Sequence, residues 1–512
     1  MSHTVDSDAQ VAHQVREPDG SPARPATREA RHLAVPTAAS ALLVAAVAPY
    51  LGQRSLWLDE SYSAVIATSS WADFAHILYR REINMSAYYL LLRLPAGMAH
   101  SEFVLRLPSL LAAVATVWYL HRLVRRELGP LPAAVAVLFF ILSSTVLSYA
   151  QEARSYTTAM LVGTASTYHL LRAMSTDRAR GQWLCWAAWS AVAPFVHIYC
   201  VFVLIGQGLA LAVSAARGGR RPAALAAVAV TTSIGLLAAV LAQSDPVPLA
   251  WIDRPHAGDM LELADATTGS DWSPTGAVAL VLTLAGVGVA IGQAIRVPAR
   301  TAAGLALAGW LVLPFGLGLL VSLTVQPILH ARYLGILVPA AATAVAVLVA
   351  AARPVLPRAL HITLVLLVLL MSLDGPIRTA RTERPTQDFS AVVHAMLDQQ
   401  QPGDGLVVTP SHYRIPVDWY LQQASAGPRR DRGLVAVFPL TQAGSYRGTH
   451  VLDRGQALQP PPTRPHRIWV IAPEYGLNPR FAATPLGRWL TQRYPTVEST
   501  PYPGLVLRLY SQ

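Results

Sequence analysis

Lysine is missing from this 512-residue chain, so its 40 basic residues other than histidine are all arginine. Cysteine is nearly missing as well. Cys185 and Cys200 both lie in apolar stretches, which predicts small core residues and no disulfide framework. Charged side chains make up only 13% of the chain, against about 25% in soluble domains. These shortages exclude an ordinary soluble domain and a disulfide-bonded secreted scaffold.

Apolar residues take the place of the missing charge. They form 53% of the chain, and the mean hydropathy is +0.38, which predicts a polytopic α-helical membrane protein. The net charge of +11 does not call for a nucleic-acid partner, because the arginines gather in short loops between apolar runs. Arginine in such loops orients helices in the lipid bilayer, so we expect the bilayer and no nucleic acid as a partner.

The apolar runs predict about eleven transmembrane helices within residues 33–374. The expected spans are 33–51, 107–119, 131–147, 157–171, 183–196, a sixth ending near 213, 223–242, 276–295, a ninth ending near 324, 334–351 and 359–373. Residues 1–32 are polar and are expected to be a disordered cytoplasmic N-terminus. Loops assigned to the inside collect arginine and loops assigned to the outside collect acids, which favours an odd span count and an outer C-terminus.

The composition changes after the last predicted span. Residues 375–387 are rich in proline and arginine and read as a linker. Residues 388–512 are expected to form a small extracytoplasmic α/β domain, because strand and helix patterns alternate there. The predicted strands are 405–408, 434–438, 468–471 and 505–509, and the predicted helices are 389–397 and 485–492.

The first outer loop, residues 54–106, begins with Leu56-Trp57-Leu58-Asp59-Glu60 directly after the first span. Carboxylates at a membrane boundary cost little free energy if they face water and much more if they lie in hydrocarbon. We hypothesise that Asp59 is a general base that activates an acceptor hydroxyl. The alternative is that Asp59 and Glu60 are ordinary solvated residues. Apolar positions in 71–78 and 84–92 predict two interfacial helices in the same loop.

Polar and aromatic residues mark the outer ends of later spans. Residues 149–156 follow the third span, His197 and Tyr199 follow the fifth, and residues 326–333 follow the ninth. If these ends converge, arginines could clamp a phosphate bidentately. A carboxylate could take the proton of a sugar hydroxyl, and aromatic rings could pack against sugar faces. Sugar transfer from a lipid phosphate would use these groups.

Four motifs then occur in a fixed order: Trp57-Leu58-Asp59-Glu60-Ser61-Tyr62-Ser63, Asn84-Met85-Ser86-Ala87-Tyr88-Tyr89, Arg106-Leu107-Pro108-Ser109 and Gln151-Glu152-Ala153-Arg154-Ser155-Tyr156. In this ordered set the chain resembles bacterial glycosyltransferase family 39-like proteins. These are integral-membrane enzymes of the glycosyltransferase-C fold, related to protein O-mannosyltransferases and lipid A aminoarabinose transferases. The resemblance implies Asp59 as the catalytic base and a polyprenyl-phosphate sugar as the donor. It departs at Met85-Ser86-Ala87, where many relatives have a Pro-Pro or Asp-Pro element.

The predicted site residues fall into three groups. They are Asp59 and Glu60 for catalysis, Arg154, Arg332 and His330 for the donor phosphate, and Tyr88, Tyr89, Gln151, Tyr156 and His197 for substrate. Glu60 is expected to support Asp59, and a divalent cation held there is a minor alternative. The local alternatives are an Arg154–Glu152 ion pair, a snorkelling Arg332 and an interfacial aromatic belt.

The sequence therefore predicts a multi-pass glycosyltransferase of a bacterial plasma membrane. It would move a sugar, with mannose as the first guess, from a polyprenyl phosphate to a cell-envelope glycan, lipid or protein on the outer face. A transporter or flippase for lipid-linked sugars is the main alternative, although transporters place substrate near the bilayer midplane. A third reading is a cell-wall scaffold with an inactive membrane part.

Overall fold

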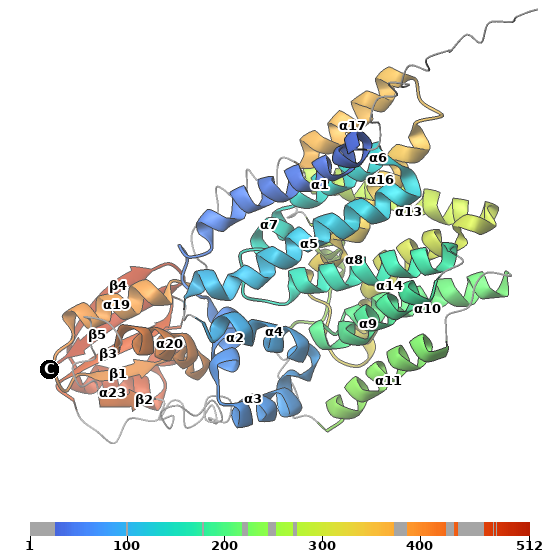
Figure 1. Cartoon of the computed structure of the whole chain (residues 1–512). Helices are drawn as coiled ribbons and strands as arrows, with labels where there is room; N and C mark the ends of the chain where they lie inside the picture. The colour runs from blue at the N-terminus through green and yellow to red at the C-terminus, as the bar shows by residue number, and fades with distance from the viewer. Residues whose placement is uncertain are drawn as a thin grey trace, which may run out of the picture.

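The computed structural model describes residues 26–98, 101–176, 179–217, 224–243, 252–269, 274–372, 387–425, 435–438, 465–474, 476–477 and 479–512. These residues form a bundle of long helices and a C-terminal unit built around a sheet (Figure 1). The short helices α2 to α4 of the first outer loop lie between these two parts. They are therefore positioned to join the bundle to the sheet.

Helices make up the part of the chain before residue 373. They are α1 (Ala26–Val47), α2 (Leu58–Thr68), α3 (Trp71–Ile77), α4 (Ser86–Ala96), α5 (Glu102–Leu128), α6 (Pro130–Ile141), α7 (Ser144–Tyr149), α8 (Tyr156–Ser175), α9 (Arg180–Val196), α10 (Cys200–Ala216), α11 (Ala224–Leu241), α12 (Met260–Ala266), α13 (Pro274–Arg296), α14 (Thr301–Thr324), α15 (Ala331–Leu334), α16 (Val338–Ala352) and α17 (Arg358–Ser372). Helices α3 and α4 coincide with the two interfacial helices expected in the first outer loop.

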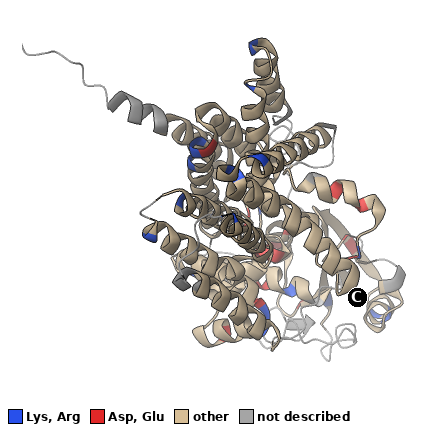
Figure 2. Ribbon diagram, turned by 90° about the vertical axis from the view of Figure 1, so that its right-hand side faces the viewer, with Lys and Arg blue, Asp and Glu red and all other residues tan. Residues whose placement is uncertain are grey.

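Five segments of the described chain are long and apolar enough to cross a membrane. They are Leu33–Tyr50, Glu102–Leu128, Thr275–Arg296, Pro298–Thr324 and Ala331–Ala352. Shorter apolar helices cover Pro130–Ile141, Cys200–Ala216, Val230–Leu241 and Arg358–Leu370. Long stretches of helix carry no charged residue, as the tan ribbon of Figure 2 shows. A multi-pass membrane protein is therefore confirmed, while the count of eleven spans remains a prediction.

Helix α5 shows how local sequence sets an element's ends. Ser101 caps its N-terminus by accepting a hydrogen bond from the Val104 N–H at 3.4 Å. Arg125 and Arg126 lie in its last turn, where a cation is favoured by the helix dipole. Gly129 then takes a φ of +96°, a backbone conformation that side chains disfavour, and this turn leads into α6.

Several expected boundaries are wrong. Helix α1 begins at Ala26, so the end of the segment expected to be disordered is helical, whereas residues 1–25 lie outside the described part. The expected span 107–119 belongs to the longer helix α5. The expected span 131–147 is broken at Ser143, whose hydroxyl caps α7 and donates to the Gly269 carbonyl at 2.7 Å. Both cysteines are free, but only Cys200 is buried, because Cys185 lies on an exposed face.

The C-terminal unit contains a five-stranded sheet of order β2-β1-β3-β5-β4. The strands are β1 (Gly405–Val408), β2 (Val435–Phe438), β3 (Arg467–Pro473), β4 (Thr496–Tyr502) and β5 (Leu505–Ser511), and the helices are α19 (Phe389–Gln399), α20 (Arg414–Ser425), α22 (Pro479–Ala482) and α23 (Pro485–Arg493). Strand β1 is parallel to both β2 and β3, and β5 is antiparallel to both β3 and β4. The predicted strands all occur in this sheet. Sequence reasoning missed α20 and the polar edge strand β4. The expected linker falls almost entirely outside the described residues.

Candidate active site

Asp59 lies in the first turn of α2, two residues after the N-cap residue Trp57. The N-terminal end of a helix favours a carboxylate because the backbone N–H groups there carry partial positive charge. The Asp59 carboxylate accepts a hydrogen bond from Arg332 Nη1 at 2.7 Å, and Arg154 Nη2 lies 3.9 Å from the same oxygen. The Asp59 side chain is 30% exposed. One half-exposed carboxylate thus lies between two cations.

Arg332 reaches this position from α15, far along the chain. His330 caps α15, because its Nδ1 accepts the Arg332 backbone N–H at 3.2 Å. The Tyr149 hydroxyl donates to the Arg332 carbonyl at 2.9 Å. The Arg332 guanidinium lies 4.6 Å from the centre of the Trp57 ring, a distance at which a cation is attracted to an indole. These contacts hold the Arg332 cation beside Asp59.

Arg154 enters from the loop between α7 and α8. Its Nη1 donates to the Asp59 carbonyl and to the Ser63 hydroxyl, each at 3.4 Å. The Ser109 hydroxyl donates to the Arg154 carbonyl at 3.1 Å and ties the loop to α5. The Arg154 side chain is 13% exposed. In place of the alternative ion pair with Glu152, the Arg154 side chain contacts α2.

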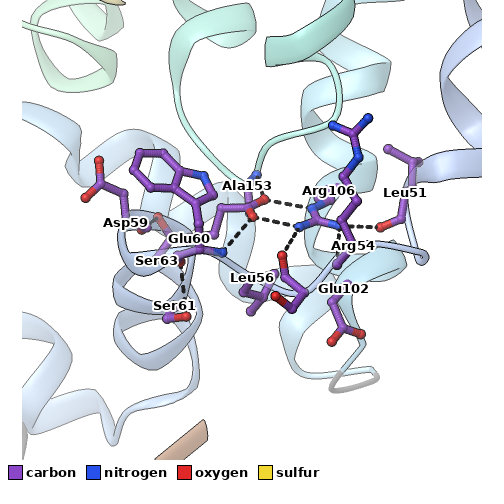
Figure 3. Close-up of polar contacts among 12 residues, drawn as sticks. Leu51, Arg54, Leu56, Asp59, Glu60, Ser61, Ser63, Glu102, Arg106 and Ala153 are labelled. Carbon is purple, nitrogen blue, oxygen red and sulfur yellow. Dashed lines mark hydrogen bonds and ion pairs between the residues drawn. The ribbon is translucent and has the colours of Figure 1, made fainter. Parts of the chain in front are cut away.

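Glu60, the neighbour of Asp59, is part of a different network. Its two oxygens accept from Arg106 Nε and Nη2, both at 2.7 Å, and the Ala153 N–H donates to Glu60 Oε1 at 2.8 Å (Figure 3). Glu60 is 1% exposed and Arg106 is 2% exposed. In Figure 3 the Asp59 side chain points away from this network. Glu60 is thus occupied as a buried ion-pair partner, and its contacts are with Arg106 and the backbone rather than with the Asp59 carboxylate that it was expected to support.

Arg106 also binds the chain that leads into α2. Its Nη1 donates to the carbonyls of Leu51 and Arg54, at 2.8 and 2.9 Å, and its Nη2 donates to the Ser55 carbonyl at 3.0 Å. A guanidinium has five donors in a planar fork, which allows one side chain to hold a carboxylate and several carbonyls together. Arg106 therefore fastens the link between the first span and α2.

Two further carboxyl groups lie near the cations. Burial raises the pKa of Glu152 to about 8, with the Glu60 charge acting in the same direction. Burial also raises the pKa of Glu82, and the Tyr89 hydroxyl donates to Glu82 Oε2 at 3.3 Å. Sequence reasoning missed Glu82, because its only signal is a spacing of seven residues from Tyr89. At neutral pH Glu152 is largely an uncharged acid that can donate a hydrogen bond.

Aromatic rings extend from Arg332 into the bundle. Tyr156 lies 4.5 Å from Tyr149 and 5.9 Å from His197, measured between ring centres. His197 lies 5.2 Å from Tyr333, which in turn lies 5.9 Å from His330. Four residues expected at the site, Tyr156, His197, His330 and Arg332, are thus brought together by α8, the loop after α9 and α15.

The two histidines are uncharged near neutral pH. Burial lowers the pKa of His197 to about 3, and the Arg154 charge acts in the same direction. Burial and the Arg332 charge also lower the pKa of His330. His330 is therefore a hydrogen-bonding group and a helix cap, and it adds no positive charge for a phosphate.

Tyr88 and Tyr89 on α4 are buried, at 0% and 1% exposure. Their ring centres are 5.9 Å apart. Neither ring offers a free face to a sugar in this structure, so the expectation that they bind substrate gains no support from their packing. Gln151 is also buried, and its amide donates to the Leu147 carbonyl at 2.9 Å.

Several buried polar atoms of this region have no hydrogen-bond partner among the described residues. They include Trp57 Nε1, Tyr88 Oη, Gln151 Oε1, Glu152 Oε2, Arg154 Nε, Ser155 Oγ and Tyr156 Oη. Buried polar groups in proteins are nearly always paired, so these atoms are available to hydrogen-bond water or a polar ligand. In the described part of the chain, no group of three or more His, Cys, Asp or Glu side chains is placed to hold a metal ion.

Comparison with known proteins agrees with this architecture. A sequence model of the dolichyl-phosphate-mannose-protein mannosyltransferase family matches residues 85–242. The solved structures of ArnT from Cupriavidus metallidurans are similar in fold. For the apo state the identity is 13%, the coverage is 94% of this chain and 98% of that chain, and the TM-score is 0.58. For ArnT bound to undecaprenyl phosphate the identity is 12%, the coverage is 95% and 98%, and the TM-score is 0.55.

A third similar structure is the archaeal oligosaccharyltransferase AglB from Archaeoglobus fulgidus, in complex with an inhibitory peptide and a dolichol-phosphate. Its identity is 10%, the coverage is 95% of this chain and 75% of that chain, and the TM-score is 0.51. No curated protein matches the sequence. The chain has the glycosyltransferase-C fold. The match to the protein mannosyltransferase family covers residues 85–242, and the likeness to ArnT is one of fold.

Proposed function

We propose that this protein is a membrane glycosyltransferase that moves a sugar from a polyprenyl-phosphate carrier to a hydroxyl of a cell-envelope acceptor. One observation carries the proposal: the Asp59 carboxylate is held between Arg332 and Arg154, next to buried polar atoms that lack partners. The fold supports it, because one similar structure was solved with undecaprenyl phosphate and another with a dolichol-phosphate.

The charges of the site suit this donor. Arg332 and Arg154 bring two positive charges, and Asp59 brings one negative charge, so one positive charge is left over. A polyprenyl-phosphate sugar is a phosphodiester with a single negative charge. Its phosphate would compete with Asp59 for the guanidinium groups and would release the carboxylate toward the acceptor. Arginine suits this exchange because its planar fork binds carboxylate and phosphate alike.

In the proposed reaction Asp59 takes the proton of the acceptor hydroxyl. The oxygen then attacks the anomeric carbon, and the bond from that carbon to the phosphate oxygen breaks. The polyprenyl phosphate leaves with the bonding electrons and so gains negative charge, which Arg332 and Arg154 stabilise. A single displacement of this kind inverts the anomeric configuration. Glu152, as an uncharged acid, would donate a hydrogen bond to the phosphate or to a sugar hydroxyl.

Mannose is the first sugar to test, because the matching family is described by its mannose donor. The acceptor is a glycan, lipid or protein of the cell envelope. The outer face is where we place the reaction, since the loops that carry Asp59 and Arg154 are assigned there by the arginine bias of the loops on the other side.

The test uses purified full-length protein, labelled polyprenyl-phosphate sugars and a cell-envelope extract. We expect a labelled product with wild-type protein. Asp59→Asn keeps the shape of the side chain and removes its charge, so it should lower turnover by about 10²–10⁴-fold, the usual cost of losing a general base. Donor binding should remain. Near-normal turnover by Asp59→Asn would show that another group is the base.

A further inference from the structure

The C-terminal unit and the first outer loop share one hydrophobic core. Leu56 and Ile66 of the loop pack in the same buried cluster as Phe389, Val417 and Tyr420 of the C-terminal unit. Figure 1 shows α20 beside α2. All five side chains are at most 3% exposed. A contact this dry and apolar holds the two parts in one arrangement.

A hydrogen-bonded tyrosine lies at the centre of this contact. The Leu56 backbone N–H donates to the Tyr420 hydroxyl at 2.6 Å. The Tyr420 hydroxyl in turn donates to Glu102 Oε1 at 2.9 Å. Tyr420 lies on α20, Glu102 opens α5, and Leu56 directly precedes the N-cap of α2. One phenol therefore ties together three elements that are remote in sequence.

The segment 51–60 is held from its other side by Arg106, which binds Glu60 and the carbonyls of Leu51, Arg54 and Ser55. The Ser55 hydroxyl also donates to the Gln387 carbonyl at 3.0 Å. The segment that leads into α2 is thus hydrogen-bonded both to Arg106 of α5 and to residues of the C-terminal unit. Asp59 lies near the end of segment 51–60, one residue before Glu60.

We propose that Tyr420 is a positioning residue for Asp59: its hydroxyl, presented by the C-terminal unit, fixes the segment that leads into α2 and so sets where the Asp59 carboxylate stands relative to Arg332 and Arg154. The inference rests on the proposed function and gives the C-terminal unit a part in it. Another side chain of this unit, His412, is near the site, since the Asp59 charge acts on its pKa against the larger lowering by burial.

Removing the Tyr420 hydroxyl would leave the Leu56 backbone N–H without a hydrogen-bond partner. Leu56 is 0% exposed, so water cannot replace a lost partner of its N–H. Removing one partner of a buried hydrogen bond costs more than removing both. The segment would relieve that cost by shifting, and a base misplaced by about 1 Å can lose 10²-fold in rate.

The experiment compares Tyr420→Phe with Tyr494→Phe in the full-length protein. Tyr494 is a matched control, since it is equally buried in the C-terminal unit and its hydroxyl donates to the Pro465 carbonyl at 2.6 Å, away from the first outer loop. We expect Tyr420→Phe to lower kcat by about 10–100-fold, with KM for the lipid donor within about twofold. Tyr494→Phe should keep both constants within about twofold. Equal kcat for the two variants would overturn the inference.

Amide hydrogen exchange supplies a readout that needs no turnover. Peptides covering residues 54–60 should exchange faster in Tyr420→Phe, while peptides of the C-terminal sheet keep their protection. Unchanged exchange at Leu56 in Tyr420→Phe would overturn the inference, whether or not the wild-type protein transfers sugar. Absence of sugar transfer by the wild-type protein would instead overturn the proposed function. Should Tyr420→Phe fail to fold, Glu102→Ala releases the same hydroxyl from α5. Glu102→Ala should also speed exchange at residues 54–60 and lower kcat, by smaller factors than those expected for Tyr420→Phe. Wild-type exchange and wild-type kcat in Glu102→Ala would overturn the inference.

Discussion

Two adjacent acids in α2 have opposite surroundings. Asp59 is about one-third exposed and faces two arginines across the site, whereas Glu60 is buried and fully bonded to Arg106 and to backbone N–H groups. Successive side chains of a helix point about 100° apart, so two adjacent residues can contact different parts of the protein. The proposed base and a buried ion-pair partner are thus adjacent side chains of one motif.

Arg332 and Arg154 should act on the donor. Replacing either by Ala is expected to weaken use of the lipid donor by about 10- to 1000-fold, because a charge-assisted contact to phosphate is lost. Lys should rescue poorly, since it lacks the planar fork. Steady-state kinetics against donor concentration measure this. Arg80→Ala is the control, since it removes a cation of the same loop whose side chain bonds to Gln243. Unchanged donor kinetics in the Ala variants would give both arginines a purely structural role.

Glu60→Gln should lose stability more than chemistry. It leaves the Arg106 cation buried without a countercharge, and breaking a buried ion pair costs roughly 3–5 kcal/mol. Thermal unfolding in detergent should show a clear drop in Tm, and the folded fraction should keep more turnover than Asp59→Asn. A double variant, Glu60→Gln with Arg106→Gln, should recover part of the loss. A wild-type Tm for Glu60→Gln would contradict the assigned role.

At the scale of elements, glycine sets how closely α10 and α14 approach. A Cβ atom added at Gly206 would stand 2.8 Å from the backbone carbon of Gly309, closer than real contacts allow. Small residues permit such close packing between membrane helices, where van der Waals contact drives association. The pair therefore behaves as a single rigid element of the bundle.

Gly206→Ala is accordingly expected to push α10 from α14 and to cost about 1–3 kcal/mol of stability. Gly208→Ala is the control on the same helix, because a Cβ there meets nothing within 4 Å. The measurement is the Tm of both variants in the same detergent, and Gly206→Ala should have the lower value. Equal Tm for both variants would mean that the two helices can separate without loss.

At the scale of the whole molecule, the arrangement in the membrane can be tested directly. The arginine bias predicts that Arg126 lies inside and that Gln400 lies outside. A reporter that works only in the cytoplasm should be active when fused after Arg126 and silent when fused after Gln400. Activity at Gln400 would overturn the predicted topology and, with it, the placement of the reaction on the outer face.

Much of this protein could be predicted from short stretches of its sequence. Apolar runs marked membrane helices, arginine marked loops, and Asp59 stood out because a charged pair directly follows an apolar span. Short apolar runs located β1, which is buried throughout, and β5, which begins with three buried residues. Such signals are local, because a helix or a strand repeats its burial every few residues. The edge strand β4 was missed because its residues are largely polar and exposed, so they form no apolar run.

Tertiary structure alone decided which residues meet. Asp59 and Arg332 are separated by 273 positions and Leu56 and Tyr420 by 364, and no periodic pattern connects residues so far apart. The ion pair of Glu60 with Arg106 was likewise hidden, since 46 positions separate the two residues. The sequence thus determined the helices and the chemistry available at their ends. Packing determined the site, because distances between side chains of different elements exist only after the chain has folded.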